Sequence, residues 1–292
     1  MQITKLFVLA LLATFSSLSF AATHQIYQTN NFNDVVKTAK ILGNKYGNQN
    51  VLLIFDMDNT LVVGNHRLGS VPWWNWQSRL LTTHPNSKLL AAHTFKGLLK
   101  VQGILFNLYG MHLVDPKIAP DITNLQREGY KAIVLSLRGD SFRSISEQTL
   151  EQNHLNFIKS AIGPYRGYPG TYYPYRLNNL ARYGISKNLA KEEHLGKARP
   201  ISYMNGILMA EGLNKGAMLL ALLKKTQYQP KAIIFVDDLN KNVINITDAF
   251  QKVNIETVAF RYGKEDKFVA NFNKNAQAKA AMTWNKIKRI MA

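Results

Sequence analysis

Short runs of hydrophobic residues recur along the chain between more polar segments. Three uninterrupted runs, at 51–55, 132–135 and 232–236, are rich in β-branched side chains, and a further strand is predicted at 256–260. Runs of this length and type are typical of strands that are buried on both faces of a parallel sheet. The pattern therefore predicts a sheet whose central strands have no solvent-exposed face.

Segments with helical spacing lie between and after these strands, with hydrophobic residues every three or four positions. They are residues 122–128, 145–150, 217–223 and 243–250. Strands that alternate with helices predict an α/β protein with a doubly wound, mainly parallel sheet. Such sheets bind ligands beyond the carboxyl ends of their strands. The residues that follow each strand are therefore the first candidates for chemistry.

Two stretches do not fit the alternating pattern. Residues 62–118 are too long for a simple crossover, so they predict a small helical cap inserted into a core made of 23–61 and 119–292. Residues 163–200 begin with a tyrosine-rich run and predict an ordered loop or a second insertion. The Lys-rich segment from 274 to 289 has amphipathic spacing and predicts a terminal helix.

Both insertions are rich in aromatic side chains. The cap holds Trp73, Trp74 and Trp76, which either pack the cap or line the entrance of a binding site, and we favour packing. The run at 163–178 holds five tyrosines and two arginines. Such a run can stack on a base or a sugar, or it can be a purely structural loop, and the sequence favours neither.

The first residues of the chain have the features of a signal peptide. Lys5 is the only charge in residues 1–22, a short apolar stretch follows it, and small residues precede Ala21 and Ala22. We expect cleavage after one of these alanines and export to the periplasm or beyond the cell. The apolar stretch is short for a membrane span of about 20 residues, although an uncleaved N-terminal anchor is the alternative.

Composition narrows the possible chemistry. Lys and Arg number 36 against 18 Asp and Glu, a formal net charge of +18, which predicts anionic partners such as phosphoesters, nucleic acid or an anionic membrane surface. The chain has no cysteine, which excludes disulfides, thiolate metal sites, a cysteine nucleophile and a lipid anchor on cysteine. Any catalysis must therefore use oxygen or nitrogen groups, or a metal that they hold.

Carboxylates follow two of the predicted strands. Asp56 and Asp58, in the sequence Asp-Met-Asp-Asn-Thr, come directly after the first, and Asp237 and Asp238 come directly after the run at 232–236. Two carboxylates at a strand end can serve one reacting group as nucleophile and proton donor. The alternative is that the first pair merely caps the next helix. Adjacent acids such as the second pair need a cation or hydrogen-bond donors to offset their repulsion.

Two further polar residues occupy similar positions. Ser136 directly follows the strand predicted at 132–135, where its hydroxyl could bind an anion or cap a helix. Lys215 directly precedes the helix predicted at 217–223, where an ammonium and a helix N-terminus together could neutralise an anion.

The order of these motifs resembles the haloacid-dehalogenase-like hydrolase superfamily, over roughly residues 50–262, and more narrowly a group of exported bacterial members. The resemblance implies a Rossmann-like core and a phosphatase that works through an aspartyl-phosphate. It implies that Asp56 is the nucleophile and that Asp58 is the general acid and base. By the same resemblance, Mg²⁺ is held by Asp56, Asp237 and the backbone of Asp58, with direct or indirect support from Asp238. Phosphate is bound by Ser136 and Lys215, and Asn59 and Thr60 shape the loop.

Two function classes follow from these observations. The first is a Mg²⁺-dependent phosphomonoester hydrolase with a small-molecule substrate, and the chemistry is self-consistent because a hard cation prefers oxygen ligands. The second is a basic binding protein with a vestigial site, for which the charge is the main argument. Neither a GxSxG elbow nor a phosphate-binding GxxxxGK[ST] loop is present, which argues against an α/β-hydrolase triad and a P-loop nucleotidase.

Overall fold

The computed structural model describes residues 23–291, and the predicted signal peptide at 1–22 lies outside this range. Its main feature is a seven-stranded sheet with the order β1-β9-β8-β2-β5-β7-β6, in which all neighbours are parallel except β6 and β7. The strands are β1 (His24–Thr29), β2 (Val51–Phe55), β5 (Lys131–Ser136), β6 (Ser202–Met204), β7 (Ile207–Met209), β8 (Ala232–Asp237) and β9 (Glu256–Tyr262). Across residues 23–291, no helix combines the length and the apolar character that crossing a membrane requires.

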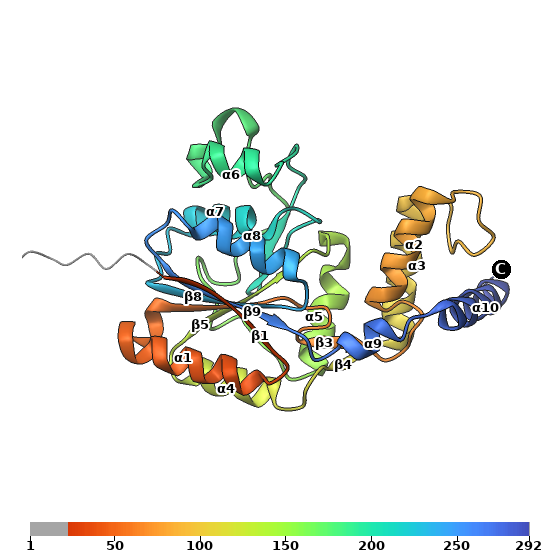
Figure 1. Ribbon diagram of the computed structural model, residues 1–292, viewed down its shortest axis with the longest axis horizontal. Helices are drawn as coiled ribbons and strands as arrows, with labels where there is room; N and C mark the ends of the chain where they lie inside the picture. Colours follow the sequence, from red (N-terminus) through yellow and green to blue (C-terminus); the bar gives the residue numbers. More distant parts are fainter. Residues whose placement is uncertain (1–22, 292) are drawn as a thin grey trace, which may run out of the picture.

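Helices cover both faces of the sheet (Figure 1). On one face lie α1 (Phe32–Tyr46) and α4 (Ile118–Arg127), and on the other α7 (Lys215–Thr226) and α8 (Asn240–Phe250). The side chains of β2 alternate between the two layers: Leu53 and Phe55 belong to the cluster with α1 and α4, whereas Leu52 and Ile54 belong to the cluster with α7 and α8. The predicted α/β, Rossmann-like, doubly wound architecture is confirmed.

All four predicted core strands and all four predicted helices are present, the remaining helix being α5 (Arg143–Gln152). The sequence analysis missed β1, an edge strand that pairs in parallel with β9, because four of its six side chains are exposed and it has no apolar run. It also missed the short hairpin of β6 and β7. Short 3-10 helices at Asn48–Asn50, Asp140–Phe142 and Leu177–Tyr183 complete the connections.

The stretch at 62–118 contains two helices and a small antiparallel ribbon. The ribbon pairs β3 (Val62–Gly64) with β4 (Met111–Leu113), and between them lie α2 (Val71–Thr83) and α3 (Phe95–Tyr109). Helix α2 has a proline in its first turn, and α3 begins where the Thr94 hydroxyl accepts a hydrogen bond from the Gly97 amide. The two strands of the ribbon therefore connect α2 and α3 to the core.

The predicted terminal helix is present as α10 (Lys274–Ile290), which follows the short helix α9 (Asp266–Ala270) and lies beside α2 and α3 (Figure 1). Trp284 of α10 is 5% exposed, and its indole Nε1 donates a hydrogen bond to the Ala91 carbonyl at 3.1 Å. Trp73 and Trp76 are buried in the same cluster, so these two tryptophans pack the cap as favoured. We call residues 65–110 and 271–291 together the cap lobe.

The stretch at 163–200 folds over α7 and contains α6 (Lys187–Glu192). Its tyrosine-rich run is tied to the strand region of β6, because the Tyr172 amide donates to the Ile201 carbonyl and the Tyr168 amide donates to the Tyr203 carbonyl. The Tyr168 and Tyr172 rings lie 4.1 and 4.5 Å from the Lys225 ammonium. These contacts favour the structural interpretation for both rings.

Candidate functional site

The carboxyl ends of three adjacent strands bring the predicted site residues together. Strand β2 lies between β8 and β5, and Phe55 pairs with Val236 on one side and with Val134 on the other. The Asp56 amide continues this ladder by donating to the Val236 carbonyl at 2.9 Å. Residues that follow the three strands therefore gather at one edge of the sheet, as the sequence predicted.

The turn after β2 is held by its own backbone and by β8. Asn59 adopts a left-handed conformation with φ of 59°, which asparagine tolerates better than most residues. The Thr60 hydroxyl accepts a hydrogen bond from the Asp238 amide at 3.0 Å and donates to Asp56 Oδ2 at 3.4 Å. The next element is strand β3, not a helix, so the alternative that Asp56 and Asp58 cap a helix is wrong.

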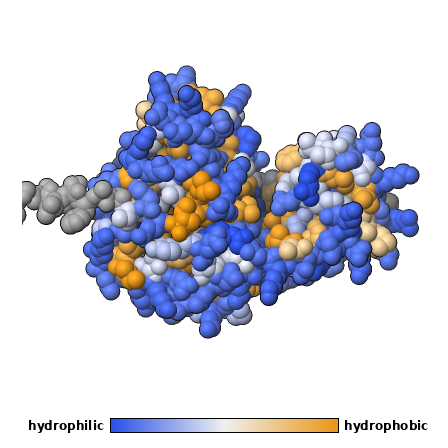
Figure 2. Space-filling model, in the orientation of Figure 1, coloured by the Kyte–Doolittle hydropathy of each residue, from blue (hydrophilic) through white to orange (hydrophobic). Residues whose placement is uncertain are grey.

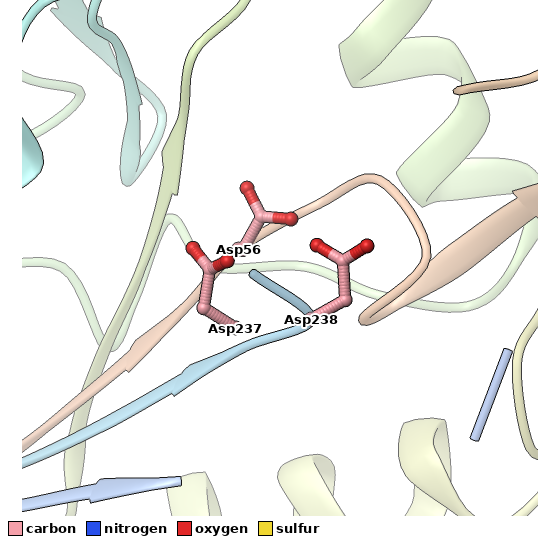
Figure 3. A group of neighbouring side chains, drawn as sticks. All are labelled: Asp56, Asp237 and Asp238. Carbon is pink, nitrogen blue, oxygen red and sulfur yellow. The ribbon is translucent and has the colours of Figure 1, made fainter. Parts of the chain in front are cut away.

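Asp56, Asp237 and Asp238 form a compact group of carboxylates (Figure 3). One oxygen from each lies within 4.8 Å of the others, and all three residues are buried. Carboxylate groups at this separation repel one another unless positive charge lies among them. The group has the oxygen chemistry that a divalent cation such as Mg²⁺ prefers.

One buried cation lies against this group. Lys215 is fully buried, and its Nζ lies 2.5 Å from Asp56 Oδ1 and 2.7 Å from Asp237 Oδ2. It is the first residue of α7, where the Asn214 side chain caps the helix by accepting from the Ala217 amide. Burial lowers the pKa of the Lys215 ammonium, but Asp237 and Asp56 together raise it by more than burial lowers it. The resulting pKa lies above the ordinary value for lysine. Lys215 is therefore charged.

Both carboxylate oxygens of Asp237 accept hydrogen bonds from the protein. Its Oδ1 accepts from the Leu239 amide at 2.8 Å, and the Asn242 side-chain amide lies 3.0 Å from both carboxylate oxygens. Together with Lys215, these contacts leave Asp237 without solvent exposure. The sequence analysis missed Asn242, and its only signal was its place in the first turn of the helix after the second acidic pair.

The two other carboxyl groups hold protons more tightly than usual. Burial raises the pKa of Asp56 to about 7, with Lys215 opposing the rise and Asp237 adding to it. Burial raises the pKa of Asp238 to about 8, and Asp56 and Asp237 add to this rise by repulsion. Lys215 alone therefore does not balance the group at neutral pH, and a further cation would be stabilised there.

Asp58 lies apart from this group and has a strong partner of its own. Arg138 donates from Nε and Nη2 to its two carboxylate oxygens at 2.8 and 2.7 Å. The Arg138 guanidinium is further fixed by a hydrogen bond to the Ser146 hydroxyl and by the Phe106 ring, 4.1 Å from the guanidinium carbon. The sequence analysis gave Arg138 no role, although a cation two residues beyond a strand-end serine was visible.

A cavity of about 580 Å³ opens between these residues and the cap. Its wall includes Asp56, Asp58, Asp238 and Arg138. The other predicted residues lie behind the wall and do not line it: Asn59, Thr60, Ser136, Lys215 and Asp237. Ser136 is buried, and its hydroxyl accepts from the Arg138 amide at 3.2 Å. The cavity thus joins acidic groups of the core to side chains of the cap.

Comparison with known proteins places the chain in a family. Residues 28–292 match the family model described as "Protein of unknown function (DUF2608)". None of the curated proteins matches the chain. Because the family model covers nearly the entire sequence, including all the residues of the acidic site, the chain belongs to the DUF2608 family.

Proposed function

We propose that the protein is a Mg²⁺-dependent phosphomonoester hydrolase of the haloacid-dehalogenase-like type, acting through an aspartyl-phosphate. The observation that carries this proposal is the buried group of Asp56, Asp237 and Asp238 around Lys215, at the floor of a cavity. Bringing carboxylates from two strand ends together and burying them costs free energy. Such groups are typical of sites that bind a cation and an anionic ligand.

The residues fit a magnesium ion. Asp56 Oδ2 and both oxygens of Asp238 accept at most one weak hydrogen bond each, at 3.4 and 3.2 Å, and both residues line the cavity. Asp237 is occupied by Lys215 and Asn242. We therefore assign Asp56 and Asp238 as the ligands that face the cavity and Asp237 as their buried support. Bound there, Mg²⁺ would supply the positive charge that offsets the phosphoryl oxygens of the substrate.

The proposed reaction has two steps, and each conserves its protons. In the first, a carboxylate oxygen of Asp56 attacks phosphorus, the bond from phosphorus to the alcohol oxygen breaks, and that oxygen takes a proton from Asp58. In the second, a water molecule attacks the aspartyl-phosphate, Asp58 takes the proton of the water, and the bond from phosphorus to Asp56 breaks. Inorganic phosphate and the original enzyme result.

Two cations position the reacting acids. Lys215 lies 2.5 Å from Asp56 Oδ1, which fixes the direction of the Asp56 carboxylate. Arg138 fixes the direction of the Asp58 carboxylate through its two parallel hydrogen bonds. The Ser136 hydroxyl accepts a hydrogen bond from the Arg138 amide. In this proposal Ser136 therefore affects the reaction only through Arg138 and Asp58.

The test is release of phosphate from p-nitrophenyl phosphate by the purified protein without residues 1–22. We expect turnover with Mg²⁺, its loss with EDTA and its return when Mg²⁺ is restored. Asp56→Asn should lower kcat by at least about a thousandfold, because a carboxylate nucleophile has no substitute. Asp34→Asn, a change in the distant helix α1, is the control. Turnover that survives in Asp56→Asn or in EDTA would refute the proposal.

A second candidate function, binding to an anionic surface, is favoured by the charge of the cap lobe. Residues 65–110 and 271–291 contain no Asp or Glu, whereas their Lys and Arg residues are Arg67, Arg79, Lys88, Lys96, Lys100, Lys274, Lys279, Lys286, Lys288 and Arg289. Leu108, Met282 and Ile290 are also exposed, at 54%, 58% and 85%. Figure 2 shows hydrophobic residues among hydrophilic ones on the visible face of this lobe.

Lysines interspersed with exposed apolar side chains favour an anionic lipid surface over nucleic acid. The test is sedimentation with vesicles of phosphatidylcholine, with and without phosphatidylglycerol. We expect binding to the anionic vesicles that falls with salt, and its loss in Lys279→Glu/Lys286→Glu. The matched control is Lys187→Glu/Lys191→Glu in α6, outside the cap lobe. Binding to RNA or DNA without binding to vesicles would reject the lipid surface.

A further inference from the structure

The cavity above the acidic group has two unlike halves. The core supplies the acids and Arg138, whereas the cap supplies uncharged side chains. The apolar ones include Trp74 of α2 and Phe95 and Leu99 of α3, and the polar ones are Ser70, Asn75, Ser78 and Gln102. Leu137 and Phe142 extend the apolar wall on the core side. A phosphate bound at the acids therefore has apolar surface on the side where the rest of a substrate must lie.

The aromatic part of this wall is open to a ligand. The Phe95 and Trp74 rings meet edge to face, with centroids 5.7 Å apart, and Phe95 is 57% exposed. An exposed aromatic side chain in a cavity gains free energy when a ligand covers it, because apolar surface leaves water. Neither ring carries a charge; Trp74 is partly buried and packs against the buried cluster of the cap lobe, whereas Phe95 does not belong to that cluster.

Among the described residues, acids outnumber arginines in the wall of the cavity. Of the two arginines in the described wall, Arg138 is held by Asp58, and Arg199 donates from Nε to the Glu211 carbonyl at 2.9 Å. The Glu211 side chain adds a negative charge at the same wall. A second phosphate, as in a diphosphate, or a carboxylate would therefore meet little compensating charge.

Resting on the phosphatase activity proposed above, we infer that the substrate is the phosphomonoester of a largely apolar, uncharged alcohol, whose hydrocarbon part lies against Trp74, Phe95 and Leu99. Volume permits this, because about 580 Å³ is within the range of cavities that enclose small organic ligands. Nucleotides, which carry further charge, fit this wall less well.

The kinetic test uses ethyl, butyl and hexyl phosphate, whose alcohols have similar leaving-group strength. Each buried methylene adds at most about fourfold to binding, so we expect kcat/KM to rise at least about tenfold from ethyl to hexyl phosphate. Phe95→Ser should flatten this rise. Ile41→Ser, in the distant helix α1 and 66% exposed, should leave it unchanged. Equal kcat/KM for the three esters, with turnover that still needs Asp56, would overturn this inference and leave the phosphatase intact.

A binding test does not depend on turnover. Calorimetry with ethylphosphonate and hexylphosphonate, which cannot be hydrolysed, measures the apolar contribution in the presence of Mg²⁺. We expect hexylphosphonate to bind at least about tenfold more tightly, and Phe95→Ser but not Ile41→Ser to remove the difference. Equal affinities would overturn the inference even if no ester is hydrolysed. Absence of turnover together with a chain-length effect would reject the phosphatase and retain the apolar site.

Discussion

Arg138 holds both carboxylate oxygens of Asp58, with its Nε 2.8 Å from Oδ2 and its Nη2 2.7 Å from Oδ1. Two parallel hydrogen bonds fix the plane as well as the position of a carboxylate. The Phe106 ring and the Ser146 hydroxyl fix the guanidinium in turn. In the proposed reaction, Asp58 moves protons, so its direction matters as much as its presence.

Arg138→Met should therefore lower kcat/KM by about a hundredfold or more. Arg138→Lys should lose less, because an ammonium keeps the charge but cannot form the paired hydrogen bonds. If Arg138 acts only through Asp58, the double variant Arg138→Met/Asp58→Asn should have the same kcat/KM as Asp58→Asn alone. Circular dichroism of each variant checks the fold. Losses that multiply in the double variant would show that Arg138 does not act through Asp58.

Lys215 is predicted to matter for stability as well as for activity. Removing one partner of a buried ion pair leaves uncompensated charge, so Lys215→Ala should lower the free energy of unfolding by about 3–5 kcal/mol in EDTA. Chemical denaturation measures this change. Lys224→Ala, near the end of the same helix, exposed and outside the acidic site, should change it by less than about 1 kcal/mol. A loss for Lys215→Ala no larger than that of the control would contradict the role given to Lys215.

The raised pKa values of Asp56 and Asp238, about 7 and about 8, predict an unusual pH dependence of stability without metal. The folded protein binds these protons more tightly than the unfolded chain does, so their contribution is complete at low pH and is lost as pH rises through 7 to 8. In EDTA, Tm should fall between about pH 6 and about pH 8.5.

Mg²⁺ should reverse this fall, since it replaces the protons between the carboxylates. The increase of Tm caused by Mg²⁺ should therefore be larger at the high end of the range. Asp238→Asn should reduce both the pH effect and the Mg²⁺ effect. A Tm in EDTA that is flat or rises over this range would be inconsistent with protonated acids in the site.

The cap lobe should depend on α10. Trp284 is 5% exposed and anchors α10 to the segment between α2 and α3, so Trp284→Ala should cost about 3–5 kcal/mol. Hydrogen exchange should show faster opening of α2, α3 and α10 than of the central strands. Met282→Ala, on the same helix at 58% exposure, is the control and should have little effect. Unchanged exchange in the cap lobe of Trp284→Ala would refute this dependence.

The sequence predicted most of the core because local patterns determine it. Apolar runs predict β2, β5 and β8, and the parallel order of the strand ends predicts that Asp56 lies near Asp237, as it does. What the sequence could not supply depends on packing between distant segments. Three features join residues that are far apart in the chain. They are the burial of Lys215 between two acids, the pairing of Arg138 with Asp58, and the packing of α10 against α2 and α3.

The site illustrates the same limit. Lys215 and Ser136 were expected to bind phosphoryl oxygens, and both lie behind the cavity wall, where they hold Asp56 and Arg138. A motif states which residue types are present, but their distance from the cavity depends on how tightly the strand ends pack. Asn242 could not be singled out for the same reason, since its role is visible only through its contact with Asp237.

The most direct measurement is identification of the phosphorylated residue during turnover. The protein is mixed with substrate and Mg²⁺, quenched in acid and digested, and the peptides are analysed by mass spectrometry with hydroxylamine to cleave acyl phosphates. A labile phosphoryl group on Asp56, absent from Asp56→Asn and from samples in EDTA, is the expected result. Steady release of phosphate with no label on Asp56, or with the label on another residue, would contradict the account.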